Sequence, residues 1–131
     1  MKVIVTGASG RMGRMLVKAI DACGNAELIG ATERPGSALL GTDAGNLAGI
    51  GALGVSVVDD LSTCEAADVL IDFTAPQACL AHAKFVAEHG MAMVIGTTGF
   101  EPSEMDELKS TLSSSRVVMA ANYSVGVNLA L

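Results

Sequence analysis

The sequence predicts an α/β fold built on a parallel sheet, and three observations favour it. Short apolar runs rich in β-branched residues alternate along the 131 residues with segments whose apolar residues recur every three or four positions. The runs do not alternate apolar and polar residues, which is typical of strands buried on both faces. A Gly-rich turn connects the first run to the first helical segment. Together these features predict one domain over residues 1–131 with a doubly wound parallel sheet.

Six apolar runs are expected to form the strands of this sheet. The run Asp-Val-Leu-Ile-Asp-Phe has the clearest character of a central strand, because it is almost wholly apolar. The six expected strands span residues 2–6, 27–32, 55–58, 68–73, 91–95 and 117–121.

The first helix is expected directly after the Gly-rich turn. Met12, Leu16 and Ile20 recur at helical spacing, and Gly24 can end the helix that they form. Residues 35–54, in contrast, are punctuated by Gly and show no clear periodicity. A stretch of this length is long for a simple connection, so we expect a functional or mobile loop there.

Three further helices are expected. A weak one covers 61–66, begun by an Asp. The next has Thr74 as its expected N-cap and ends at Gly90. The last opens with Ser103, and Asp106 three residues later resembles a capping box.

Composition and charge exclude several classes of function. Eight Lys and Arg against 14 Asp and Glu give a net charge of −6, and no basic run offers a footprint for nucleic acid or an anionic membrane. Cys23, Cys64 and Cys79 are widely spaced, which favours small core residues in a reducing compartment over a disulfide framework or a metal site. No apolar stretch has the length of a signal peptide or a membrane span. We therefore expect a cytoplasmic protein.

Residues 7–13, Gly-Ala-Ser-Gly-Arg-Met-Gly, carry a G-x-x-G-x-x-G spacing between the first expected strand and helix. Gly7 is expected to make the tight turn, Gly10 to let a pyrophosphate approach the backbone, and Gly13 to let the helix pack closely on the strand. Free N–H groups at the start of a helix suit phosphates. Ser9 stands where a Gly is often found. The segment predicts a dinucleotide site, with a plain tight turn as the alternative.

Glu33 and Arg34 follow the second expected strand. A carboxylate at this place can accept both ribose hydroxyls of NADH, and an adjacent Arg can pair with the 2′-phosphate of NADPH. We therefore expect either NADH or NADPH to be the cofactor. The alternative is an exposed ion pair at the entrance of a loop.

Two more segments are expected at the same edge of the sheet. Gly-Thr-Thr-Gly-Phe at 96–100 suits a nicotinamide carboxamide and its ribose, although a Gly-rich turn is the alternative. Ala-Asn-Tyr-Ser at 121–124 follows the last strand. His82 and His89 share one expected helix and are predicted to be surface or helix-terminus residues away from these loops. No residue is assigned a catalytic or a metal-binding role.

In order along the whole chain, GASGRMG, ER followed by PGSALLGTDAGNLAG, DVLIDFTAP, VIGTTGF and AANYSVGVN resemble the N-terminal part of dihydrodipicolinate reductases. The resemblance implies a Rossmann-like doubly wound domain that binds NADH or NADPH. It also implies hydride transfer to a cyclic dicarboxylate imine in diaminopimelate and lysine biosynthesis. The implied cofactor contacts are Gly7, Ala8, Ser9, Gly10, Arg11, Met12, Glu33, Arg34, Gly96, Thr97, Thr98, Ala120, Ala121, Asn122 and Tyr123.

The family's second domain carries a His-His-x-x-Lys stretch and a Ser-Gly-Thr loop, and neither occurs in these residues. We therefore expect that 125–131 begins a helix leading to a missing substrate domain and that this fragment alone is inactive. The resemblance implies a homotetramer for the full-length protein, but the family's tetramer contacts lie largely in the missing part.

Two other functions are alternatives to that of a dihydrodipicolinate reductase. One is a stand-alone NAD(P)-binding module without catalysis. The other is an extended short-chain dehydrogenase-like reductase, whose chemistry needs a Tyr with a Lys four residues later. The only Tyr is Tyr123, and position 127 is Val, so the residues present do not support that second alternative.

Overall fold

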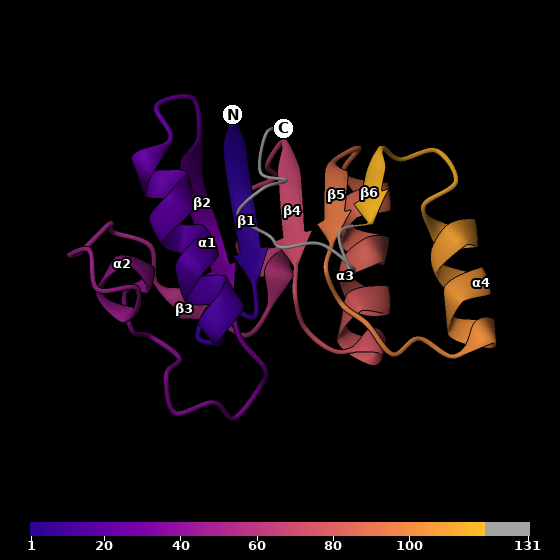
Figure 1. Ribbon diagram of the computed structural model, residues 1–131, viewed down its shortest axis with the longest axis horizontal. Coiled ribbons are helices and arrows are strands. Elements are labelled where there is room, and N and C mark those ends of the chain that lie inside the picture. Colours follow the sequence, from indigo (N-terminus) through magenta and orange to yellow (C-terminus); the bar gives the residue numbers. More distant parts are fainter. Residues whose placement is uncertain (120–131) are drawn as a thin grey trace.

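The computed structural model describes residues 1–119, which form a six-stranded parallel sheet flanked by helices (Figure 1). The strand order is β3-β2-β1-β4-β5-β6, and every neighbouring pair is parallel. The predicted doubly wound sheet is therefore confirmed. The strands are β1 (Lys2–Thr6), β2 (Glu27–Thr32), β3 (Val57–Val58), β4 (Val69–Asp72), β5 (Ala92–Ile95) and β6 (Val117–Met119). The helices are α1 (Arg11–Ala22), α2 (Ala44–Leu47), α3 (Pro76–Glu88) and α4 (Pro102–Thr111), with a 3-10 turn η1 (Leu61–Thr63).

The core lies on both faces of the central strands. Helices α1 and α2 pack on one face of the sheet, and α3 and α4 pack on the other (Figure 1). Val3, Ile4 and Val5 of β1 are at most 1% exposed as a result. This two-sided burial is the reason that the strand is continuously apolar.

Strands β1 and β2 have the bounds that the sequence predicts, and β3 is shorter. The prediction starts β3 at Val55, but the carbonyl of Val55 accepts the N–H of Ala44 instead of pairing with β2. The weak helix expected at 61–66 is only the turn η1, because Cys64 already has extended backbone. Strand β6 ends the described part at Met119, so the rest of the expected strand at 117–121 lies outside the described residues.

Both later helices begin at a proline, so the predicted starts of these two helices are wrong. The N-cap of α3 is Ala75, whereas the hydroxyl of Thr74 donates to Asp72. Helix α4 begins at Pro102, before the predicted Ser103. Its first turn is closed by a hydrogen bond from the backbone N–H of Glu101 to the carboxylate of Glu104, at 2.8 Å. Proline suits the first helical position because it has a fixed φ and needs no hydrogen-bond acceptor there.

The cysteines differ in burial, against the expectation that all three are core residues. Cys79 is buried on α3 and Cys64 is half-buried. Cys23 is exposed, because α1 ends at Ala22 and the chain has already left the face that packs on the sheet. The prediction is therefore wrong for Cys23.

The long segment 35–54 is organised around one carboxylate, that of Asp43. This side chain caps α2 and accepts backbone N–H groups from the start of α2 and from residues 53–55, at 2.8–3.2 Å. Its pKa lies below the ordinary value, chiefly because the N–H of Leu53 donates to the charged form. The donors are Gly45, Asn46, Leu53, Gly54 and Val55. The segment is thus an ordered loop with a short helix that the periodicity did not reveal.

Asp43→Ala is expected to loosen this loop without unfolding the sheet. The amide hydrogens of Leu53, Gly54 and Val55 lose their acceptor and should exchange with solvent faster, while those of β1 keep their protection. Hydrogen exchange followed by mass spectrometry measures both. Asp21→Ala, an exposed change on α1, is the control, and unchanged exchange at 53–55 would contradict the role given to Asp43.

Candidate dinucleotide-binding site

The predicted binding segments within residues 1–119, which are 7–12, 33–34 and 96–98, lie at one edge of the sheet, the edge to which all six strands point with their carboxyl ends (Figure 1). A cavity of about 950 Å³ opens there. Its walls are the Gly-rich loop after β1, the residues after β2, the turn η1, and the segment from Phe73 into α3. Ligands of open α/β sheets bind at this position, beside the point where the strand order reverses.

The Gly-rich loop has the geometry that its spacing predicts. Gly7 has φ +70°, and a Cβ added there would lie 2.9 Å from the carbonyl oxygen of Phe73. A Cβ on Gly13 would lie 2.1 Å from the carbonyl oxygen of Gly7, so α1 can approach β1 this closely only with Gly at 13. The tight turn and the close packing are thereby confirmed.

The N-terminus of α1 is left without a side-chain cap. Its N-cap is Gly10, which is exposed and lines the cavity. The first N–H groups of a helix need an acceptor, and an anionic ligand can supply one. The residues present therefore fit a pyrophosphate at this loop.

Glu33 is held against the Gly-rich loop by Ser9. The Oε2 atom of Glu33 accepts both the backbone N–H of Ser9, at 2.9 Å, and the Ser9 hydroxyl. Its Oε1 atom accepts the N–H of Arg34 at 3.2 Å. Burial alone would raise the pKa of this carboxyl, but the hydrogen bonds from Ser9 and Arg34 outweigh burial and lower it. This bond was not predicted from the sequence, in which the one signal for it is Ser at position 9.

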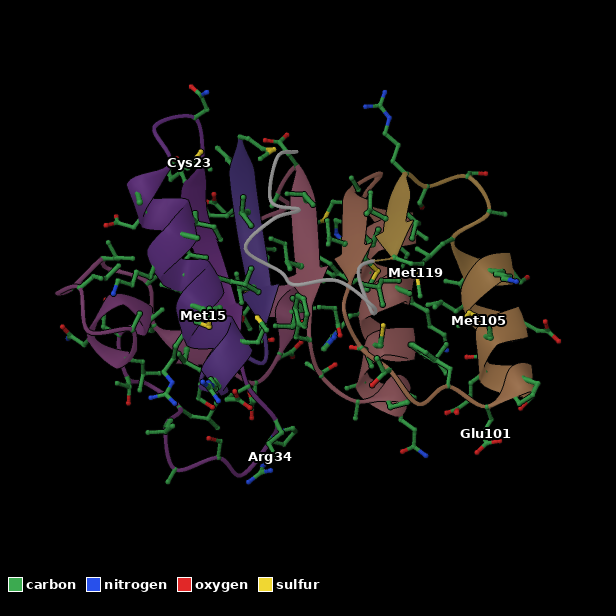
Figure 2. The ribbon with its side chains drawn as sticks, in the orientation of Figure 1. Met15, Cys23, Arg34, Glu101, Met105 and Met119 are labelled. Atoms are coloured by element: carbon green, nitrogen blue, oxygen red, sulfur yellow. The ribbon has the colours of Figure 1, made fainter. Side chains whose placement is uncertain are left out.

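Arg34 is exposed and lines the cavity just after β2. Figure 2 shows it beyond the carboxyl end of the sheet, with its side chain extending away from the strands. Within residues 1–119 its guanidinium makes no ion pair, so the alternative of an ion pair with Glu33 does not hold. The charge is available to an anionic group in the cavity.

Asp72, at the carboxyl end of β4, is fully buried and was not predicted as part of the site. Its carboxylate accepts the hydroxyls of Thr6 at 3.0 Å, Thr74 at 2.7 Å and Thr97 at 2.6 Å, and it contacts Nδ1 of His82. Burial favours the neutral acid, but His82 and the Thr97 and Thr74 hydroxyls outweigh it, so the pKa lies below its ordinary value. We call these five side chains the Asp72 cluster.

His82 is half-buried, lines the cavity and contacts Asp72, so the prediction that it lies away from the site is wrong. The face of α3 that carries it turns toward the end of β4. His89 is exposed after α3, where its Nδ1 lies 2.8 Å from the carbonyl oxygen of Phe85, so that prediction is confirmed.

Within residues 1–119 the expected contacts fall into three groups, the third being the segment 96–98 after β5. Gly7, Ser9, Gly10, Glu33 and Arg34 line the cavity. Ala8 is buried under the loop, whereas Arg11 and Met12 begin α1. Residues 120–123 lie outside the described residues.

The segment after β5 lies beside the cavity and not in its wall. Gly96 packs against Phe73, whose ring would lie 1.9 Å from a Cβ at position 96. Thr97 is buried and faces Asp72, and Thr98 is exposed.

Comparison with known proteins decides the family. The family model described as dihydrodipicolinate reductase, N-terminus, matches residues 1–123. The chain belongs to this reductase family. Proteins named 4-hydroxy-tetrahydrodipicolinate reductase from Chromohalobacter salexigens and Acinetobacter baumannii are each 50% identical to it over 99% of its length. The alignments cover 49% and 48% of those proteins, so the chain spans about half the length of these family members.

Solved structures show the same fold at lower identity. A dipicolinate-bound dihydrodipicolinate reductase from Paenisporosarcina matches 96% of the chain with a TM-score of 0.72 and 21% identity, over 49% of its own length. An amine dehydrogenase from Mycobacterium smegmatis matches 91% of the chain with a TM-score of 0.71 and 23% identity, over 38% of its own length. Both therefore support the Rossmann-like architecture of this family member.

None of the helices within residues 1–119 is both long and apolar enough to cross a membrane. No group of three or more His, Cys, Asp or Glu side chains among the same residues is placed to hold a metal ion.

Proposed function

We propose that the chain is the NADH- or NADPH-binding part of 4-hydroxy-tetrahydrodipicolinate reductase. The reaction is hydride transfer to a cyclic dicarboxylate imine in diaminopimelate and lysine biosynthesis. One observation carries the proposal: the Gly-rich loop and the Glu33–Arg34 pair share one cavity, in a chain 50% identical to proteins of that name. The family and the fold both imply a nicotinamide cofactor.

The chain's own residues bind and orient the cofactor. The uncapped start of α1 would hold the pyrophosphate, and Arg34 the 2′-phosphate when NADPH binds. When bound, the nicotinamide supplies the hydride. The proposed contacts are Gly7, Ala8, Ser9, Gly10, Arg11, Met12, Glu33, Arg34, Gly96, Thr97, Thr98, Ala120, Ala121, Asn122 and Tyr123.

The nicotinamide end is proposed at residues 96–98. The hydroxyl of Thr97 accepts the N–H of Thr74 at 2.9 Å and donates to Asp72, so this residue is held by the fold. Thr98, the next residue, is exposed, and its hydroxyl is proposed to contact the nicotinamide end. The groups that bind the imine and supply its proton belong, in this proposal, to the half of the relatives that the chain does not cover.

We also propose that the full-length protein is a cytoplasmic homotetramer with a small-molecule substrate, and that 125–131 leads into its substrate domain. The test is fluorescence titration with NADH and NADPH, followed by a turnover assay with the cyclic imine. Full-length protein should bind and turn over, whereas residues 1–131 should bind without turnover. Turnover by residues 1–131 alone would show that the catalytic groups are misplaced. Failure of the full-length protein to bind either nucleotide would overturn the proposal.

Arg34→Ala is expected to weaken NADPH binding by about 1.5–3 kcal/mol, the size of a hydrogen bond to a charged group. NADH binding should stay nearly unchanged, because NADH lacks the 2′-phosphate. Dissociation constants from fluorescence titration measure both. Lys109→Ala removes an exposed cation on α4 and serves as the control. Equal losses for the two nucleotides would contradict the role of Arg34.

A further inference from the structure

The Glu33 carboxylate has little acceptor capacity left for a ligand. An ionised carboxylate offers about four lone-pair sites, two on each oxygen. Ser9 fills both sites of Oε2 with its N–H and its hydroxyl, and the N–H of Arg34 fills one site of Oε1. Among these contacts one site remains, on Oε1. A carboxylate in this state can accept one ribose hydroxyl, and not the two expected from the sequence.

NADH and NADPH meet this carboxylate differently. The two ribose hydroxyls of NADH can both bind only if the Ser9 hydroxyl leaves Oε2. NADPH carries a 2′-phosphate, which gains from Arg34 and is repelled by the charge of Glu33. The Ser9 hydroxyl partly neutralises that charge and keeps the carboxylate on the side of the Gly-rich loop.

We propose that Ser9 is a specificity-determining residue that acts through Glu33 and biases the site toward NADPH. The inference rests on the proposed function, since it concerns how the same site discriminates between two nucleotides. Ser9 is a positioning residue here. Its hydroxyl occupies the place on Oε2 that a ribose hydroxyl of NADH would otherwise take.

Ser9→Ala isolates the hydroxyl, because the backbone N–H of residue 9 still donates to Oε2. Two acceptor sites then face the ribose, so NADH should bind more tightly. NADPH should bind more weakly, because its 2′-phosphate meets a less neutralised carboxylate. The ratio of the NADPH to the NADH dissociation constant should rise about tenfold, the effect of one hydrogen bond to a charged group.

The experiment measures both dissociation constants by titration of the full-length protein. Ser9→Thr keeps a hydroxyl and should keep the wild-type ratio. Ser103→Ala, an exposed change on α4, controls for loss of an unrelated hydroxyl. Carbon-13 NMR of the Glu33 carboxyl gives a second readout: its pKa should rise in Ser9→Ala, which has lost a bond to the charged form.

The outcomes test the role of Ser9 separately from the proposed nucleotide-binding function. A tenfold rise in Ser9→Ala, absent in Ser9→Thr and Ser103→Ala, supports the inference. An unchanged ratio, or equal weakening of both nucleotides, overturns the inference and leaves the proposed function standing. Wild-type protein that binds neither nucleotide overturns the proposed function and the inference with it.

Discussion

Gly13→Ala is expected to destabilise the protein by about 3 kcal/mol, the upper part of the range for overpacked sites. The added Cβ would lie 2.1 Å from the carbonyl oxygen of Gly7, and 2.8 and 2.9 Å from backbone atoms of Ala8. These neighbours are backbone, so no side-chain rotation relieves the contact. The loop must open or α1 must move off β1, and either change should remove the phosphate site. Urea unfolding and NADH titration measure the two effects.

Two other glycines provide matched controls. A Cβ on Gly10 has its closest atom, the Gly7 carbonyl oxygen, at 3.4 Å, and a Cβ on Gly24 meets nothing within 4 Å. Gly10→Ala should cost less than about 1 kcal/mol in stability and still weaken nucleotide binding, because position 10 lines the cavity. Gly24→Ala should change neither. If Gly13→Ala is as stable as Gly24→Ala, the packing argument is wrong.

Asp72→Ala is expected to cost about 3–5 kcal/mol, the range for removing one partner of a buried charged contact. The change removes the carboxylate that His82 contacts and that accepts the hydroxyls of Thr6 and Thr97. These hydroxyls keep only longer contacts to backbone carbonyl oxygens, at 3.3 Å for Thr6 and 3.5 Å for Thr97. Chemical denaturation measures the loss. Asp106→Ala, on the exposed face of α4, is the control and should stay within about 0.5 kcal/mol of wild type.

The contribution of Asp72 should also depend on pH in a defined direction. Its pKa is lower in the folded protein than the ordinary value of 3.8, so the folded state favours the charged form. That stabilisation is complete above the unfolded pKa and is lost as the pH falls through the lower folded pKa. The difference in unfolding free energy between wild type and Asp72→Asn should therefore shrink below pH 3.8. A difference that grows on acidification would contradict the assignment.

The sequence predicts the strands better than the polar contacts between them. β1 and β2 are found at their predicted bounds, because burial on both faces leaves a continuous apolar run with polar ends. The starts of α3 and α4 were misplaced by one or two residues, because Pro at the first position overrides a nearby Thr or Ser as cap.

The Asp72 cluster could not be predicted in the same way. Its members come from β1, β4, the segment after β4, the segment after β5, and α3, and only the strand register brings Thr6 opposite Asp72. One signal was present: two otherwise apolar runs end in a polar residue, Thr6 in one and Asp72 near the end of the other. The Ser9–Glu33 bond likewise joins residues 24 positions apart, through the pairing of β1 with β2.

The Ser9–Glu33 contact and the Thr97–Asp72 contact differ in how quickly they can rearrange. Ser9 and Glu33 are both only half-buried, so breaking the contact between their side chains needs no more than a change of side-chain rotamer, which takes picoseconds to nanoseconds in accessible residues. Thr97 is tied to a carboxylate that no solvent reaches, so it can move only when the sheet edge itself opens, on a much slower timescale. The end of the cavity beside β2 is thus adaptable within a single encounter with a nucleotide. The segment after β5 is a fixed neighbour of the cavity over the lifetime of the complex.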